Sequence, residues 1–218
     1  AIVAFYGAPI DVKEHELMAC RTAIKMQERL AELREQWQAE GDRWPEIVHH
    51  MQNRIGINTG QLVTGNMGSE SRMNYTMMGD TVNLAARLES SAKQYGIYIQ
   101  IAESTYQAIQ DKIVVRALDF VQVMGKEEPV KVFELISEIG KEPEPYKKIL
   151  PAFHEGIELY FNQDWDKAKE AFKASNDLEE MFPGRKTNPS RVYIARCEHF
   201  KVNPPGDNWD GVWVHTSK

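Results

Sequence analysis

The sequence predicts an α/β domain followed by a small, entirely helical module. Short apolar runs typical of strands, such as 55–57 and 130–136, alternate with segments in which apolar residues recur at helical spacing. From about residue 149 onward the helical spacing stands alone. We therefore expect two units, 1–137 and 149–218, joined by a proline-containing linker over 138–148.

Composition and charge exclude several classes of protein. Hydrophobic residues make up 42% of the 218 residues, enough for a true core, and charged residues make up 27%. The net charge of −6 leaves no basic stripe, so we expect no nucleic-acid partner. No apolar run approaches the roughly 18 residues of a membrane span, and we see no signal-peptide pattern. Cys20 and Cys197 belong to no Cys-x-x-Cys pair, so we expect two reduced, mostly buried thiols in a cytoplasmic protein.

The first forty residues predict a strand and then a long helix. Apolar residues over 2–6 are typical of a buried strand that Gly7-Ala8-Pro9 ends. Because the chain opens inside this strand, we expect it to be a fragment of a longer protein. From about Val12 to Ala39 an apolar stripe recurs at spacings of three, four and seven. Its members are Leu17, Cys20, Ala23, Ile24, Leu30, Leu33 and Trp37.

The stretch 54–89 predicts a hairpin and then a helix. The apolar runs 55–57 and 62–63 flank Thr59-Gly60, which favours a hairpin between them. Gly65 and Gly68 then suggest a loop, and 75–78 suggests another short strand. We expect Asp80 or Thr81 to cap the helix that follows. Its expected apolar stripe is Val82, Ala85, Ala86 and Leu88.

On that helix Asn83 and Arg87 stand four residues apart, so they lie on a single face. Asn can hydrogen-bond a hydroxyl or ring oxygen, and Arg presents a planar fork to phosphate oxygens. The pair therefore suits phosphoryl transfer. Taken alone, such a pair is about ten times more often a solvated helix face than a site.

The wider context makes the stretch specific. The run Gly79-Asp80-Thr81-Val82-Asn83-Leu84-Ala85-Ala86-Arg87-Leu88-Glu89 resembles the signature segment of the class III nucleotide cyclases, which make cyclic AMP or cyclic GMP from the triphosphate. The resemblance implies a ferredoxin-like sheet with covering helices, mixed and mainly antiparallel. It also implies a site at a homodimer interface, where Asn83 orients the ribose and Arg87 stabilises the phosphate in the transition state.

The resemblance places the metal site outside this chain. In the family, a strand ending in Phe-x-Gly-Ala-Pro directly follows a Gly-Asp pair, which would end one residue before Ala1. Two Mg²⁺ or Mn²⁺ ions are therefore expected on Asp residues upstream, together with the Lys that reads adenine in many of these enzymes. We expect no stand-alone turnover from the fragment, and a sensor or membrane domain can precede it in the parent protein.

Two further residues acquire roles by resemblance. Thr76 stands where many adenylyl cyclases carry the Asp that reads the adenine amino group, and a Thr hydroxyl can accept the same bond. Lys126 follows Gly125 in a loop before 129–133, where the family's Lys holds the terminal phosphates. Without the resemblance, Thr76 is an ordinary strand residue and Lys126 a solvated loop residue.

The rest of the chain predicts the second half of the sheet and the tail. We expect strands at 98–101, 114–123 and 130–136, the last two antiparallel, and a short helix at 104–109. His49 and His50 are expected in a loop. In the tail, the positions of Gly156, Ala168 and Phe172 resemble one tetratricopeptide repeat, which should dock on the main domain or on a partner. Trp209 and Trp213 either pack on these helices or line a peptide-binding surface.

The combined interpretation is an adenylate cyclase that converts ATP into cyclic AMP and pyrophosphate in signal transduction. A regulatory or degenerate cyclase half that binds nucleotide or a partner without turnover is the alternative, as is a guanylate cyclase. A tetratricopeptide adaptor would need more repeats than the sequence contains.

Overall fold

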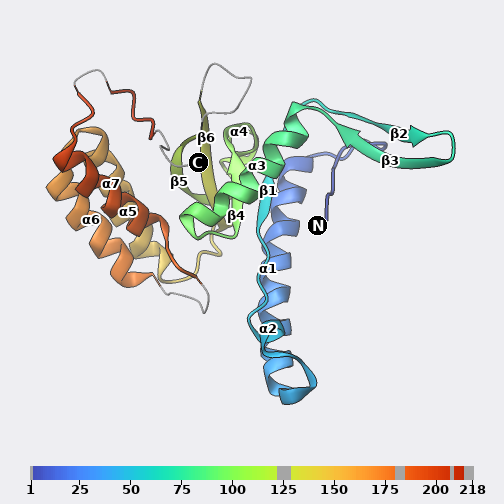
Figure 1. Ribbon diagram of the computed structural model, residues 1–218, viewed down its shortest axis with the longest axis horizontal. Coiled ribbons are helices and arrows are strands. Elements are labelled where there is room, and N and C mark those ends of the chain that lie inside the picture. The colour runs from blue at the N-terminus through green and yellow to red at the C-terminus, as the bar shows by residue number, and fades with distance from the viewer. Residues whose placement is uncertain (1, 122–128, 180–184, 207–208, 214–218) are drawn as a thin grey trace.

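The computed structural model describes residues 2–121, 129–179, 185–206 and 209–213. Helices cover both faces of a central sheet, and one of them is long and extends below it. A two-stranded arm projects to one side, and a helical tail packs on the other (Figure 1). The α/β class predicted from the sequence is confirmed.

The main sheet has the strand order β1-β4-β6-β5. β1 (Ile55–Ile57) runs parallel to β4 (Ile99–Ala102). β6 (Val130–Glu138) pairs antiparallel with β4 on one side and with β5 (Ile113–Val121) on the other. The sheet is therefore mixed and mainly antiparallel, and the predicted antiparallel pairing of the last two strands is confirmed.

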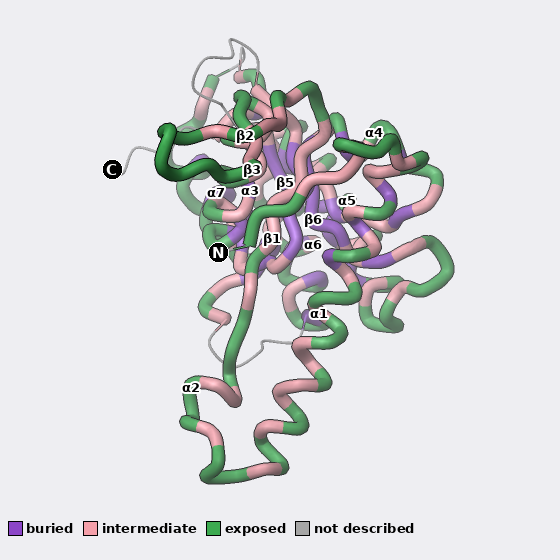
Figure 2. The backbone as a smooth tube through the Cα atoms, turned by 90° about the vertical axis from the view of Figure 1, so that its right-hand side faces the viewer, coloured by how far each residue is buried: buried purple, intermediate pink, exposed green. Residues whose placement is uncertain are grey.

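Alternation along the strands divides the core into two layers. Ile99, Ile101, Phe133 and Leu135 face α1 (His15–Ala39) and α4 (Glu103–Ile109). Ala102, Leu118 and Val132 face α3 (Asp80–Tyr95), which covers the opposite side. Buried residues gather along these strands (Figure 2). The helix with the signature segment therefore lies on one face of the sheet, where Val192 of α7 (Pro189–Val202) packs beside it.

Only the first turns of α1 belong to this core. Leu17, Cys20 and Ala23 are buried, whereas the later members of the predicted stripe are only partly covered. The far half of α1 projects as a stalk, with η1 (Gly41–Arg43) and α2 (Glu46–His49) folded back on it (Figures 1 and 2). Trp37 and Trp44 pack against each other near the tip of the stalk, with 6.0 Å between their ring centroids. His49 thus ends a short helix instead of lying in a loop.

The first residues do not form the predicted buried strand. Residues 2–10 have no regular secondary structure, and Ile2 and Val3 are exposed by 86% and 68%. Among the described residues this segment has no strand beside it, so its backbone gains no ladder hydrogen bonds. Phe5 instead approaches Tyr75 at 6.1 Å, and the Tyr6 hydroxyl donates to Thr22 Oγ1 over 2.8 Å.

The hairpin forms one strand later than predicted. β2 (Val63–Ser69) pairs with β3 (Arg72–Met78), with Val63 opposite Met78 and Ser69 opposite Arg72. Gly65 and Gly68 therefore lie within a strand, not in a loop. The 55–57 run pairs with β4 instead, and just after it Asn58 Nδ2 donates to the Thr81 carbonyl over 3.0 Å.

The tail consists of α5 (Tyr146–Phe161), α6 (Trp165–Leu178) and α7 (Pro189–Val202). Gly156 lets α5 and α6 cross closely, because a Cβ there would lie 2.7 Å from the Phe172 ring. Trp209 and Trp213 pack against this helical core, as one of the two expectations for them proposed. Cys20 and Cys197 are free and buried, as predicted. Among the described residues, no helix is both long enough and apolar enough to cross a bilayer.

Candidate active site

The candidate site starts at the junction between β3 and α3. Gly79 adopts a φ of 142°, a conformation that side-chain-bearing residues rarely reach, and turns the arm into the helix. Gly79, not the predicted Asp80 or Thr81, is the N-cap, and no side chain caps this end. Asp80 occupies the first turn instead, where its negative charge complements the helix dipole.

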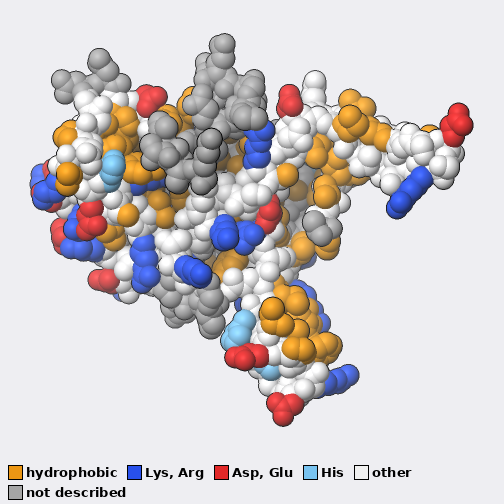
Figure 3. Space-filling model, in the orientation of Figure 1, with side chains coloured by type: hydrophobic (Ala, Val, Ile, Leu, Met, Phe, Trp, Pro, Cys, Tyr) orange, Lys and Arg blue, Asp and Glu red, His pale blue; other side chains and the backbone are white. Residues whose placement is uncertain are grey.

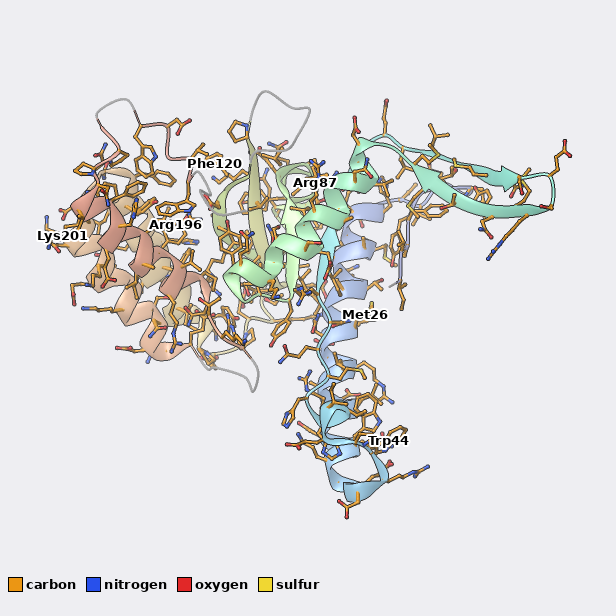
Figure 4. The ribbon with its side chains drawn as sticks, viewed as in Figure 1. Met26, Trp44, Arg87, Phe120, Arg196 and Lys201 are labelled. Atoms are coloured by element: carbon orange, nitrogen blue, oxygen red, sulfur yellow. The ribbon has the colours of Figure 1, made fainter. Side chains whose placement is uncertain are left out.

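Asn83 and Arg87 are both exposed on α3. The buried face of the helix consists of Leu84, Leu88, Ala92 and Tyr95. This differs from the predicted stripe, of which Leu88 is buried but Ala86 is exposed. The opposite face of α3 packs on the sheet. Asn83 and Arg87 therefore lie about one helical turn apart on the face exposed to solvent. Figure 4 shows Arg87 on α3, between the projecting arm and the helical tail.

Close backbone contact holds this helix on the sheet. A Cβ on Gly56 of β1 would lie 2.2 Å from the Ala85 carbonyl oxygen and 2.4 Å from the Glu89 nitrogen. Only glycine allows strand and helix to approach so closely. A Cβ on Gly60 would likewise meet Thr81 Oγ1 at 2.8 Å. These backbone contacts hold the segment of α3 that carries Arg87 close against β1.

A shallow depression of about 370 Å³ borders Arg87 and is also lined by Ala86, Ser90, Ser91 and Gln94. It is open to solvent, and both polar and apolar atoms line it. An Arg on such a surface can reach an anionic ligand without first breaking a buried ion pair.

Thr76 lies in β3, opposite Gly65 of β2, and is half-buried. It stands three residues before Gly79, so Thr76, Asn83 and Arg87 flank the same junction between strand and helix. Lys126, the fourth residue expected at the site, lies outside the described residues.

The part of the chain that the structure describes contains no group of three or more His, Cys, Asp or Glu side chains positioned to hold a metal ion. The residues present therefore do not fit the two-metal centre that the resemblance implies.

A larger cleft, of about 470 Å³, lies on the opposite face of the sheet, between α1 and β6. It is lined by Ile24, Ala31, His49, Leu135 and Ser137, among others. Ser137 Oγ and His49 Nε2 are buried there without a hydrogen-bond partner among the described residues. Sequence reasoning named no site in this region, because its walls come from segments far apart in the chain.

Comparison with known proteins gives the same family at several levels. The model of the "Adenylate and Guanylate cyclase catalytic domain" family matches residues 2–137. The chain is 34% identical over 191 residues, or 86% of its length, to a terminal-differentiation-specific adenylate cyclase of Dictyostelium discoideum. It is 32% identical over 136 residues, or 62% of its length, to adenylate cyclase 1 of Rhizobium meliloti. It spans only 8% and 20% of these two relatives.

Among solved structures, the adenylyl cyclase CyaB of P. aeruginosa is similar with a TM-score of 0.53 and 32% identity, over 63% of this chain and 68% of that one. The guanylyl cyclase Cya2 is similar with a TM-score of 0.50 and the same 32% identity, over 62% of this chain and 65% of that one. Both likenesses leave more than a third of the chain uncovered.

Proposed function

Because the chain belongs to the adenylate and guanylate cyclase catalytic-domain family, we propose that it is the part of an adenylate cyclase that converts ATP into cyclic AMP and pyrophosphate in signal transduction. The observation that carries the proposal is the Asn83 and Arg87 pair, exposed on a helix that backbone contacts hold in place. The relatives in Dictyostelium and Rhizobium bear the name adenylate cyclase, which favours ATP over GTP.

In the proposed reaction the ribose 3′-hydroxyl gives its proton to water while its oxygen forms a bond to the α-phosphorus, and the bond from that phosphorus to the bridging oxygen of pyrophosphate breaks. Asn83 hydrogen-bonds the ribose and orients it for attack. Arg87 donates to the phosphate oxygens on which charge develops in the transition state. Thr76 accepts a hydrogen bond from the adenine amino group, and Lys126 holds the terminal phosphates.

Two Mg²⁺ or Mn²⁺ ions would neutralise the triphosphate. Since the described residues offer no ligand cluster, we propose that carboxylates beyond this chain hold them. In a homodimer, one subunit would supply these carboxylates and the other Asn83 and Arg87. The arm formed by β2 and β3 supports such an assembly, because its Val63, Met73 and Met78 are at least 60% exposed. Apolar side chains gather along this projecting arm (Figure 3).

Guanylate cyclase activity is the second candidate, since Cya2 is as similar in sequence as CyaB. A regulatory half that binds nucleotide without turnover is the third candidate, which the lack of a metal-ligand cluster among the described residues favours. Both of these candidates share the fold with an adenylate cyclase. A guanylate cyclase would form cyclic GMP, and a regulatory half would form no product.

The test is a cyclase assay with ATP or GTP and either Mn²⁺ or Mg²⁺. The chain is assayed beside a version extended upstream of Ala1 with the natural coding sequence. We expect cyclic AMP from the extended version alone. Cyclic GMP as the main product would support the second candidate. Binding of nucleotide without any product from either version would support the regulatory half. Product from the chain alone would overturn our account of the metal site.

A further inference from the structure

The last residue of α3 is tied into the sheet and the tail. Tyr95 is 2% exposed, and its hydroxyl donates to Asp119 Oδ2 of β5 over 2.7 Å. Burial, together with the neighbouring Asp119 carboxylate, raises the pKa of Tyr95, so the phenol stays protonated and can donate. The helix that presents Asn83 and Arg87 therefore ends on a buried carboxylate.

The same oxygen also receives a hydrogen bond from the tail. Arg196 of α7 donates from Nη2 to Asp119 Oδ2 over 2.6 Å, and both side chains are almost fully buried. The Arg196 guanidinium further lies 5.0 Å from the Tyr193 ring and 5.1 Å from the Trp213 ring. Figure 4 shows Arg196 within the tail, on the side toward the sheet. One carboxylate oxygen thus joins α3, β5 and α7.

Backbone packing brings the same elements together. Gly96 ends α3 in the left-handed conformation with a φ of 63°. A Cβ there would lie 2.0 Å from the Thr187 carbonyl oxygen, just before α7. Tyr193 of α7 also donates from its hydroxyl to the Leu118 carbonyl of β5. The end of α3 is therefore in contact with the tail through both backbone and side chains.

A second buried network holds the tail on the same strand. Arg116 of β5 donates to both Glu179 oxygens over 2.9 Å and to Glu134 of β6 over 2.7 Å. Breaking a buried ion pair leaves an unpaired charge away from water. These ion pairs hold the tail in one position on β5. Since Asp119 of the same strand accepts hydrogen bonds from both α7 and α3, the position of the tail also constrains α3.

From these contacts we propose that the helical tail is a positioning element for α3, and that Tyr95, Asp119 and Arg196 are its positioning residues. Arg87 and Tyr95 are eight residues apart, or roughly 12 Å along a rigid helix. A tilt or rotation at Tyr95 therefore displaces Arg87. Its consequence for catalysis rests on the proposed cyclase function, where a displacement of about 1 Å can cost a hundredfold in rate.

The direct test is amide hydrogen exchange of the whole chain, which needs no activity. Tyr95→Phe removes only the hydroxyl, and Tyr106→Phe is the matched control, since Tyr106 stacks on Phe133 in the layer with α4. We expect exchange in the last two turns of α3 to accelerate about tenfold in Tyr95→Phe, the effect of losing a hydrogen bond to a charged group. Exchange in α1 should stay unchanged, and the control should match wild type.

Arg196→Met tests the link from the tail, and Arg196→Lys keeps a cation that can partly restore it. We expect faster α3 exchange in the Met variant and an intermediate rate in the Lys variant. If Arg196→Met does not fold, Tyr95→Phe still decides. Unchanged α3 exchange in Tyr95→Phe would overturn the proposal, as would an equal acceleration in α1, which reports global destabilisation.

A second experiment measures ATP turnover in the active, extended protein. Tyr95→Phe should lower kcat about tenfold and leave KM for ATP within about twofold, because orientation acts on the transition state. Wild type that makes no cyclic nucleotide would defeat the proposed function and leave the exchange data to decide on positioning. An active enzyme in which Tyr95→Phe changes neither exchange nor kcat would defeat the positioning role alone.

Discussion

Arg87 is exposed on α3, so replacing it tests chemistry with little effect on packing. In the extended protein, Arg87→Ala should lower kcat by more than about tenfold, because its guanidinium acts mainly on the charge of the transition state. The melting temperature should stay within about 2 °C of wild type, as expected for an exposed site. Steady-state cyclase kinetics beside thermal unfolding check both statements. An unchanged kcat in a folded variant would remove Arg87 from the mechanism.

Thr76 tests selectivity between the two nucleotides. Its hydroxyl is proposed to accept the adenine amino hydrogen, so Thr76→Ala should lower the ratio of kcat/KM for ATP to that for GTP by about tenfold, the worth of one such hydrogen bond. Thr76→Ser keeps the hydroxyl and should retain most of the preference. Competition assays with both nucleotides give the ratio directly. The same ratio in wild type and Ala variant would show that adenine is read elsewhere.

At the scale of elements, we predict that the arm of β2 and β3 takes part in self-association of the protein. Met73 and Met78 are each 60% exposed on a projection that packs on little else in the chain (Figure 1). Met73→Lys with Met78→Lys should weaken self-association by more than about tenfold, because burying either ammonium in an apolar interface is costly. Sedimentation velocity over a range of concentrations measures the effect.

The stalk provides the control for that experiment. Ile47 of α2 is 79% exposed at the other projection of the molecule. Ile47→Lys adds the same kind of charge away from the arm and should leave self-association unchanged. Equal weakening by both sets of substitutions would point to net charge as the cause and not to the arm.

At the scale of the whole molecule, the ion pairs between sheet and tail make stability depend on pH. Burial raises the pKa of Glu179, but Arg116 and Arg185 oppose it and leave that pKa below its ordinary value. The folded state therefore binds this proton less readily than the unfolded chain. The stabilisation is fully present above the unfolded pKa of about 4.3 and is lost as pH falls through the lower folded value.

Glu179→Gln isolates this contribution. At pH 7 it should lower the free energy of unfolding by about 3 kcal/mol, the cost of breaking a buried pair. The difference from wild type should shrink as pH falls below about 4. Burial raises the pKa of Glu134, which acts in the opposite sense, and since the Glu179 charge adds to that rise, this opposing contribution is smaller in Glu179→Gln. Chemical denaturation from pH 3 to 7 measures the difference in free energy of unfolding between wild type and Glu179→Gln. A difference that does not change with pH would show that Glu179 stabilises the protein through packing and not through its charge.

Much of the candidate site could be predicted because it depends on local sequence. Asn83 and Arg87 share a face through helical spacing alone, and Gly79 marks the junction before them. The buried face of α3 was predicted less well, since Leu84 and Tyr95 are covered by strands distant in sequence. The buried ion pairs of Arg116 and Asp119 were not predicted, because both residues were treated only as parts of a strand. Two charged residues within an otherwise apolar run are nevertheless a sign of buried ion pairs.

The sequence by itself determined the α/β class, the main strands and helices, the helical tail and the family, because propensity, periodicity and a contiguous motif are local properties. Only the tertiary structure decided that β1 pairs in parallel with β4, that the hairpin forms between β2 and β3, and that residues 2–10 form no strand. It also decided that Asp119 joins α3 to the tail. Strand partners and buried charge pairs depend on segments that meet only after folding, so their energies cannot be read from either segment alone.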